Sequence, residues 1–158
     1  IIRDLGVIVD SKLSFSAHFA HITAKAHQRA GLISRCFKSR VPHILFRAFK
    51  VYVRPIVEYC SPVWSPVYKS DIRKIEAVQR RFTKRLKYCS HLSYAERLNY
   101  LKDETLELRR LKQDLITIFK ILNKLLNVKI SEKLIGYHPH VHRRNHHGDR
   151  GGPVPPNF

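Results

Sequence analysis

Basic side chains gather on one side of a predicted helix between residues 72 and 87. At about 3.6 residues per turn, five apolar residues fall within roughly a third of its circumference: Ile72, Ile75, Val78, Phe82 and Leu86. The opposite side carries seven cations, which we call the basic face: Arg73, Lys74, Arg80, Arg81, Lys84, Arg85 and Lys87. Solvated helix surfaces usually mix signs, because i,i+4 ion pairs stabilise a helix by a few tenths of a kcal/mol and like charges cost as much. A face of one sign therefore indicates an anionic partner.

Nucleic acid is the anionic partner that we favour for the basic face. Lys and Arg side chains that contact phosphates release counterions, which gives affinity and salt sensitivity without recognition of the base sequence. Two other interpretations stay open, an ordinary solvated surface and an anionic membrane surface. The membrane is less favoured, because the apolar side of the helix is rich in β-branched residues, unlike the apolar side of interfacial helices.

Four further side chains have the chemistry to bind a ligand. Tyr68 and Tyr88 bracket the basic helix and could stack on a base or a sugar. Tyrosines at helix ends are more often half-buried, and we favour that interpretation. His18 and His21 lie three residues apart on another predicted helix, where we expect both to be surface residues.

The composition indicates a folded, cationic chain. It has 158 residues, a hydrophobic fraction of 44% and a formal net charge of +18, and a charge of that size concerns partners rather than fold. The three cysteines are widely spaced and form no disulfide framework, which favours a reducing compartment, the nucleus or the cytoplasm.

No apolar run approaches the ~20 residues of a membrane span, and nothing resembles a signal peptide. Met is absent, so we interpret the sequence as a piece of a longer polypeptide.

Enzymatic motifs are missing from the sequence. It contains no phosphate-binding glycine loop, no dinucleotide fingerprint, no H-E-x-x-H and no G-x-S-x-G. The only adjacent acids, Asp103 and Glu104, stand at a helix entrance, where negative charge is favoured by the helix dipole. We therefore predict no catalytic residue, no cofactor and no closed metal site. Five tail histidines could bind a transition metal only loosely: His138, His140, His142, His146 and His147.

The elements that must position the basic face are predicted to be helices. A short strand over 6–9 precedes a helix over about 15–37, capped by Ser14 or Ser16. The next helix has Pro42 in its first turn, and Pro55 is expected to kink it.

The second half of the chain predicts three more helices. The stretch 61–66 holds two prolines and should break the preceding helix. Ser70 should cap the basic helix, and Ser93 with Glu96 forms a capping box that opens a helix ending at Leu101. The last helix should run from Thr105 to about residue 127.

These elements predict an all-α fold of about five helices packed as an irregular bundle. A strand and turn (1–13) should precede a helical, thumb-like domain (14–128), and a tail (129–158) should be disordered. Within the domain, the apolar side of the basic helix should pack against a turn at Trp64 and against the last helix. This packing should hold the basic face in place.

Three stretches in this order resemble the region that follows the palm in non-LTR retrotransposon reverse transcriptases of the LINE-like, Jockey/CR1 type. They are RDLGVIVDSKLSF from Arg3, YVRPIVEYCSPVW from Tyr52, and IEAVQRRFTKR from Ile75 followed by LSYAERL from Leu92. The resemblance covers residues 3 to about 127. After about residue 135, where related chains usually continue with an ordered segment, this chain becomes rich in His, Gly and Pro.

The resemblance implies a helical thumb or connection segment that holds the template–primer duplex of an RNA-directed DNA polymerase. It makes residues 1–13 the end of the preceding palm. It places the catalytic aspartates and their Mg²⁺ further upstream, outside this sequence, so the segment is expected to be inactive alone. The partner would be an RNA–DNA or DNA duplex, and no membrane or small-molecule substrate is expected. Two alternatives stay open: a cationic protein-interaction module and a non-functional retroelement remnant.

Overall fold

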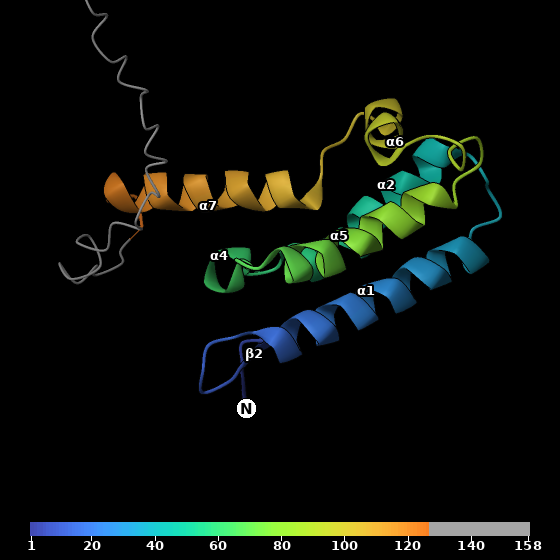
Figure 1. Cartoon of the computed structure of the whole chain (residues 1–158). Helices are drawn as coiled ribbons and strands as arrows, with labels where there is room; N and C mark the ends of the chain where they lie inside the picture. The colour runs from blue at the N-terminus through green and yellow to red at the C-terminus, as the bar shows by residue number, and fades with distance from the viewer. Residues whose placement is uncertain (127–158) are drawn as a thin grey trace, which may run out of the picture.

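The computed structural model describes residues 1–126. In this part of the chain, a two-stranded antiparallel hairpin precedes seven helices (Figure 1). The elements, in chain order, are β1 (Ile2–Asp4), β2 (Val7–Val9), α1 (Ser16–Cys36), α2 (Pro42–Tyr52), α3 (Arg54–Glu58), α4 (Ser61–Trp64), α5 (Lys69–Lys84), α6 (Tyr94–Leu101) and α7 (Leu106–Leu122).

The all-α fold class is confirmed, but the five predicted helices become seven among the described residues. The second predicted helix ends at Tyr52, and α3 begins at Arg54 with Pro55 in its first turn. The stretch predicted to break the helix itself forms the single turn α4, with Pro62 in that turn, after a break at Cys60. Both prolines occupy helix starts, where a missing N–H costs no intrahelical hydrogen bond.

Two predicted helix starts are confirmed. Ser93 and Glu96 form the capping box at the start of α6, with both reciprocal hydrogen bonds present. Thr105 caps α7 by accepting a hydrogen bond from the backbone N–H of Leu108. Each of these caps depends only on residues within one helical turn, so the local sequence is enough to predict them.

Two other predicted caps are wrong. α1 has Phe15 as its N-cap residue, in a left-handed conformation, and neither Ser14 nor Ser16 caps it through a side chain. The Ser14 hydroxyl donates to Asp10 in the preceding turn and accepts a long hydrogen bond of 3.5 Å from the N–H of Ser16, the first residue of α1. α5 begins at Lys69, so Ser70 lies inside its first turn and does not cap it.

The core lies where α1, α2 and α5 meet. The rings of Phe49 in α2 and Phe82 in α5 stack with centroids 4.7 Å apart. Trp64 is buried, with its ring edge toward Phe19 of α1, and its Nε1 donates to the carbonyl of Tyr59 at 2.8 Å. The ring of Trp64 therefore packs on α1, whereas the sequence predicted a turn at Trp64 that packs on the basic helix.

The hairpin is attached to this core. Val7 is buried in it, and the backbone N–H of Ile8 donates to Nδ1 of His18 in α1 at 3.3 Å. The strand β2 therefore packs directly on α1, whereas all three residues of β1 are exposed.

The last helix contacts the other helices mainly through its first half. Leu106 and Arg110 are buried, and Asp114 accepts a hydrogen bond from the Ser65 hydroxyl at 2.9 Å. From Leu108 onward its apolar side is exposed. The predicted contact between the basic helix and the last helix is present, and it involves the start of α7. Figure 1 shows α7 extending past α4 and away from α1. The predicted tail (129–158) and the end of the predicted last helix lie outside the described residues.

Candidate nucleic-acid interface

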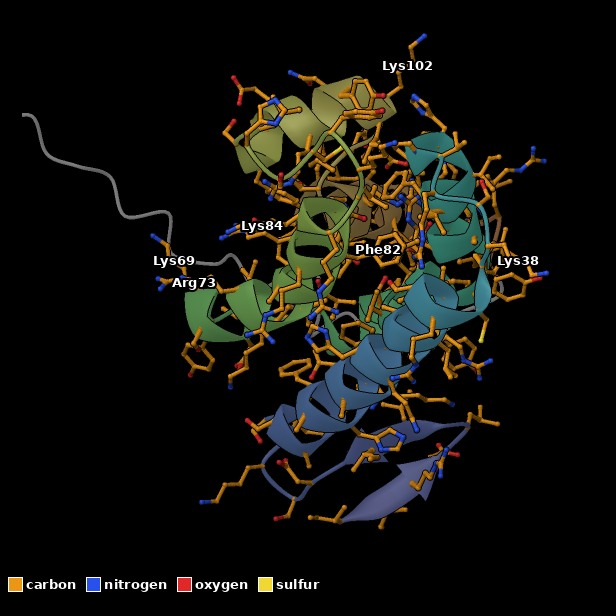
Figure 2. The ribbon with its side chains drawn as sticks, turned by 90° about the vertical axis from the view of Figure 1, so that its right-hand side faces the viewer. Lys38, Lys69, Arg73, Phe82, Lys84 and Lys102 are labelled. Atoms are coloured by element: carbon orange, nitrogen blue, oxygen red, sulfur yellow. The ribbon has the colours of Figure 1, made fainter. Side chains whose placement is uncertain are left out.

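The basic face is held outward because α5 is buried over the rest of its circumference. Ile75, Val78 and Phe82 are buried, as predicted, and this apolar edge faces α1 and α2. Figure 2 shows Phe82 pointing into the molecule, whereas Arg73 and Lys84 extend from α5 into solvent. A helix fixed by packing in this way presents its remaining arc rigidly.

A second buried edge of α5 is polar, and it was not predicted. Glu76 accepts hydrogen bonds from the backbone N–H groups of Leu106 at 3.2 Å and Glu107 at 3.1 Å, and from the Tyr94 hydroxyl. Gln79 donates to the Tyr94 hydroxyl at 3.2 Å and to a backbone carbonyl in the α6–α7 connection at 2.8 Å. Burial and the bonded Glu76 carboxylate raise the pKa of Tyr94.

This polar edge fixes α6 and α7 to the basic helix. Glu76 places a negative charge at the start of α7, where free N–H groups and the helix dipole favour it. Thr83 accepts a hydrogen bond from Nε of Arg97 in α6 at 3.2 Å. The three- and four-residue spacing of Glu76, Gln79 and Thr83 was the signal available in the sequence. The sequence analysis considered only apolar residues as buried and therefore missed this polar edge.

All seven residues of the basic face are exposed. Five of them lie on α5, but the helix ends at Lys84, earlier than the predicted 87. Arg85 is its C-cap residue and Lys87 lies in the turn that follows. The basic face is therefore a helical ridge continued by two residues of the next turn.

Few carboxylates approach the basic face within residues 1–126. Lys74 is paired with Asp71 at 2.8 Å. Arg80 lies over the ring of Tyr94 and Lys87 over the ring of Tyr88, each 4.9 Å from the centroid. The other four, in the described part of the chain, have no ion pair: Arg73, Arg81, Lys84 and Arg85.

Three other acidic residues are bonded to cations outside the basic face. Glu58 binds Arg109 with both carboxylate oxygens, at 2.6 and 3.2 Å. Asp103 binds Arg54 at 2.8 Å, and Glu104 is paired with Lys112. Because these carboxylates neutralise cations near α3 and α7, the Lys74–Asp71 pair is the one ion pair that compensates the basic face within residues 1–126.

A cleft of about 360 Å³ runs between α5 and α1 beside the basic face. Its lining contains no carboxylate and consists of Thr23, His27, Ser70, Arg73, Lys74, Ala77 and Arg81. Burial, and then the charges of Arg81 and Arg85, lower the pKa of His27 below its usual value. His27 is a residue that sequence reasoning missed, because only the packing of α1 on α5 brings it beside the basic face.

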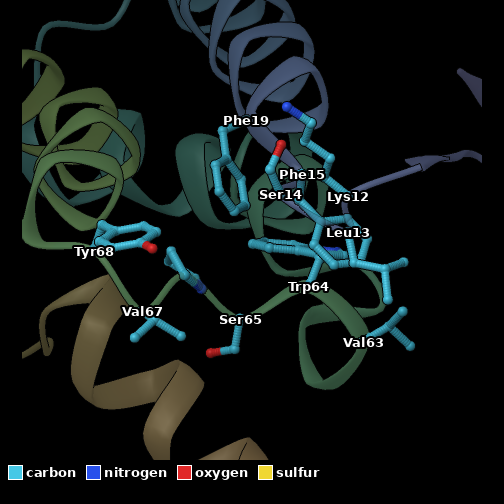
Figure 3. Close-up of a pocket in the computed structure, with 11 residues that line it drawn as sticks. Lys12, Leu13, Ser14, Phe15, Phe19, Val63, Trp64, Ser65, Val67 and Tyr68 are labelled. Atoms are coloured by element: carbon cyan, nitrogen blue, oxygen red, sulfur yellow. The ribbon is translucent and has the colours of Figure 1, made fainter. Parts of the chain in front are cut away.

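A second, larger pocket of about 430 Å³ lies at the N-terminal end of α5. Figure 3 shows the side chains of Phe19, Trp64 and Tyr68 around it, with Lys12 nearby. Tyr68 is the N-cap residue of α5 and is 74% exposed, and Tyr88 beyond the other end is 65% exposed. The half-buried interpretation of these two tyrosines is therefore wrong. Both rings can accept a stacking partner from solvent.

The prediction that both histidines of α1 are surface residues is wrong for His18. Its ring is buried edge-on against Trp64, with centroids 5.2 Å apart, and burial lowers its pKa. His21 is exposed. Within residues 1–126, no three His, Cys, Asp or Glu side chains are grouped as a metal site would need, and no helix is both long and apolar enough to cross a membrane.

Comparison with known proteins gives one distant relative. An uncharacterized protein of Caenorhabditis elegans is 29% identical over 125 residues, which cover 77% of this chain and 63% of the relative. The chain thus spans less than two thirds of the length of that relative. No family model and no solved structure matches the chain.

Proposed function

We propose that this chain is a nucleic-acid-binding segment that grips the sugar-phosphate backbone of an RNA–DNA or DNA duplex through the basic face. The observation that carries the proposal is the exposure of all seven cations, of which Lys74 alone is paired with a carboxylate within the described residues. Unpaired like charges held on a rigid helix repel one another, and an anionic polymer relieves that repulsion.

The dimensions of α5 suit a phosphate backbone. Its 16 residues correspond to a length of about 24 Å at about 1.5 Å per residue. Duplex DNA carries one charge per ~1.7 Å of its axis, so the basic face can contact several phosphates at once. Each contact releases condensed counterions, which makes the binding strong at low salt and independent of base sequence.

The cleft between α1 and α5 offers one phosphate a deeper position. Arg73, Lys74 and Arg81 line it together with the hydroxyl of Ser70. These groups donate hydrogen bonds, and charge-assisted bonds to phosphate are the stronger ones. Tyr68, exposed at the N-terminal end of the same helix, is placed to stack on a sugar or an unpaired base of the bound strand.

The resemblance of the sequence to post-palm regions of non-LTR retrotransposon reverse transcriptases supports the same proposal. In that setting the chain is the part of an RNA-directed DNA polymerase that holds the template–primer duplex while an upstream palm does the chemistry. The palm and its Mg²⁺ are then outside this sequence, and the segment acts by positioning alone.

The proposal is tested by the salt dependence of duplex binding. The triple variant Arg81→Ala, Lys84→Ala, Arg85→Ala removes three unpaired cations. We expect the slope of log K against log salt, measured by fluorescence anisotropy with an RNA–DNA hybrid, to fall by about 2.7, since each contact contributes about 0.9. Affinity at low salt should fall by more than tenfold.

The matched control removes the same charge elsewhere. Arg35, Lys38 and Arg47 are exposed on α1, the α1–α2 connection and α2, and Figure 2 shows Lys38 on the other side of the molecule from Lys84. Their triple Ala variant should keep nearly the full slope. Equal slopes in the two variants would mean that net charge, not the basic face, binds the duplex. An acidic peptide that displaces the duplex as well as heparin does would favour the protein-interaction alternative.

A further inference from the structure

The exposed side of α7 carries an apolar stripe with a regular spacing. Its members are separated alternately by three and four residues: Leu108, Leu111, Leu115, Ile118, Leu122 and Leu125. All six are exposed, Leu115 to 58% and Leu122 to 67%. The first five lie within α7, and Leu125 lies just beyond its end. This is the a and d spacing of a two-helix seam, and large exposed apolar surfaces usually mark an interaction site.

The stripe points away from the helices that hold α7. Leu106 and Arg110 face α4 and α5 and are buried, and Asp114 on the same side is bonded to Ser65. The polar edge of α5 fixes the first turn of α7 through Glu76. A partner helix can therefore lie along the stripe without displacing a buried contact. One exposed pair shares a residue with the proposed seam, because Lys112 is bonded to Glu104 of its own chain and would be shared with the partner.

The charges that flank the stripe favour a second copy of the same helix. With Leu108 and Leu115 at a positions, Glu107 takes a g position and Lys112 the following e position. In a parallel pair, g of one helix lies beside the next e of the other, so Glu107 of each copy meets Lys112 of its partner. An antiparallel pair sets g beside g and e beside e, and this attraction is lost.

We propose that two copies of the chain associate through α7 as a parallel helix pair, with the apolar stripe as the interface. Two heptads are a short seam, so the pair should be in a concentration-dependent equilibrium with the monomer. This inference uses no residue of the basic face and stands whether or not the chain binds nucleic acid.

Sedimentation equilibrium of the full chain over the micromolar range tests the proposal. We expect a monomer–dimer equilibrium that Leu115→Glu weakens by at least tenfold. The control is Ile116→Glu, because Ile116 is also exposed and apolar but lies outside the stripe; it should leave the equilibrium unchanged. Circular dichroism should show the same helix content for both variants, since neither position supports the core. A chain that stays monomeric, or that forms larger oligomers, overturns the proposal.

Charge reversal tests the parallel orientation. Glu107→Lys alone places Lys beside Lys in the pair, and Lys112→Glu alone places Glu beside Glu, so each variant should dimerise more weakly than the parent chain. Mixed together, the two variants restore both opposite-charge contacts and should form a heterodimer in preference to either homodimer. A mixture that shows no such preference overturns the parallel pairing.

Discussion

Helices α5 and α7 are both amphipathic, yet they face opposite ways. α5 buries Ile75, Val78 and Phe82 and exposes cations, whereas α7 exposes its leucines and buries Leu106 and Arg110. α5 lies between α1 on one edge and α6 and α7 on the other, so its apolar side has partners within the chain. α7 is held by its first half, and most of its apolar side has none among the described residues.

The difference shows what each helix requires from outside the described structure. The exposed side of α5 is charged, and water and salt ions can solvate and screen it. The exposed side of α7 is apolar and is relieved only by another apolar surface. Three changes can break or sharpen this contrast.

The largest expected effect comes from the same truncation made on both helices. Phe82→Ala removes a ring that is 4% exposed and stacked on Phe49, and should lower the free energy of unfolding by about 3–5 kcal/mol. Phe119→Ala removes a ring that is 60% exposed and should change it by less than about 0.5 kcal/mol. Urea unfolding at a dilute, monomeric concentration measures both. Similar losses for the two variants would show that the apolar side of α7 packs within the chain.

The features that could be predicted from sequence are those that depend on neighbours in the sequence. The capping box of Ser93 and Glu96 and the Thr105 cap form within one turn, and the periodicity of residues 72–86 identified the buried apolar edge of α5. The exposure of the basic face followed from the same periodicity. Fold class and candidate site were therefore accessible without coordinates.

The features that could not be predicted depend on contacts between distant residues. His18 is buried because Trp64 and the hairpin close over it. Glu76 is buried because the start of α7, thirty residues later, needs an acceptor. The apolar spacing of α7 is as regular as that of α5. Such spacing predicts that a helix has an apolar side, but it does not predict which surface packs on that side.

A second, smaller loss of stability is expected for a change at Glu76, which joins α5 to α7. Glu76→Gln keeps the shape of the side chain but replaces the carboxylate by an amide. That carboxylate accepts hydrogen bonds from two backbone N–H groups of α7 and from the Tyr94 hydroxyl. One N–H of the new amide then faces a donor, so we expect a loss of about 1–3 kcal/mol in the free energy of unfolding. Asp4→Ala, which removes an exposed carboxylate of the hairpin, is the control. An unchanged stability in Glu76→Gln would mean that α7 is held without this bond.

The smallest expected effect is a change of duplex affinity with pH. It distinguishes the basic face, which has a histidine beside it, from the apolar stripe of α7. His27 faces Arg73, Lys74 and Arg81 across the α1–α5 cleft, and Arg85 lies near enough to act on it. Burial, and then the charges of Arg81 and Arg85, lower the pKa of His27 in the free chain, so its ring is neutral at neutral pH. Protonating it costs stability as pH falls below its ordinary value of about 6.5.

A phosphate bound in the cleft reverses this balance. Its negative charge offsets the arginines and favours the imidazolium, so the pKa of His27 rises on binding and the complex takes up a proton. Duplex affinity at constant salt should therefore increase several-fold between about pH 7.5 and pH 6, with a limit of tenfold for each unit of pKa difference. His27→Gln should show a smaller increase, set by the exposed histidines alone. Because α7 contains no histidine, dimerisation should not follow this pH change. The same pH dependence in His27→Gln would remove the cleft from the phosphate-binding surface.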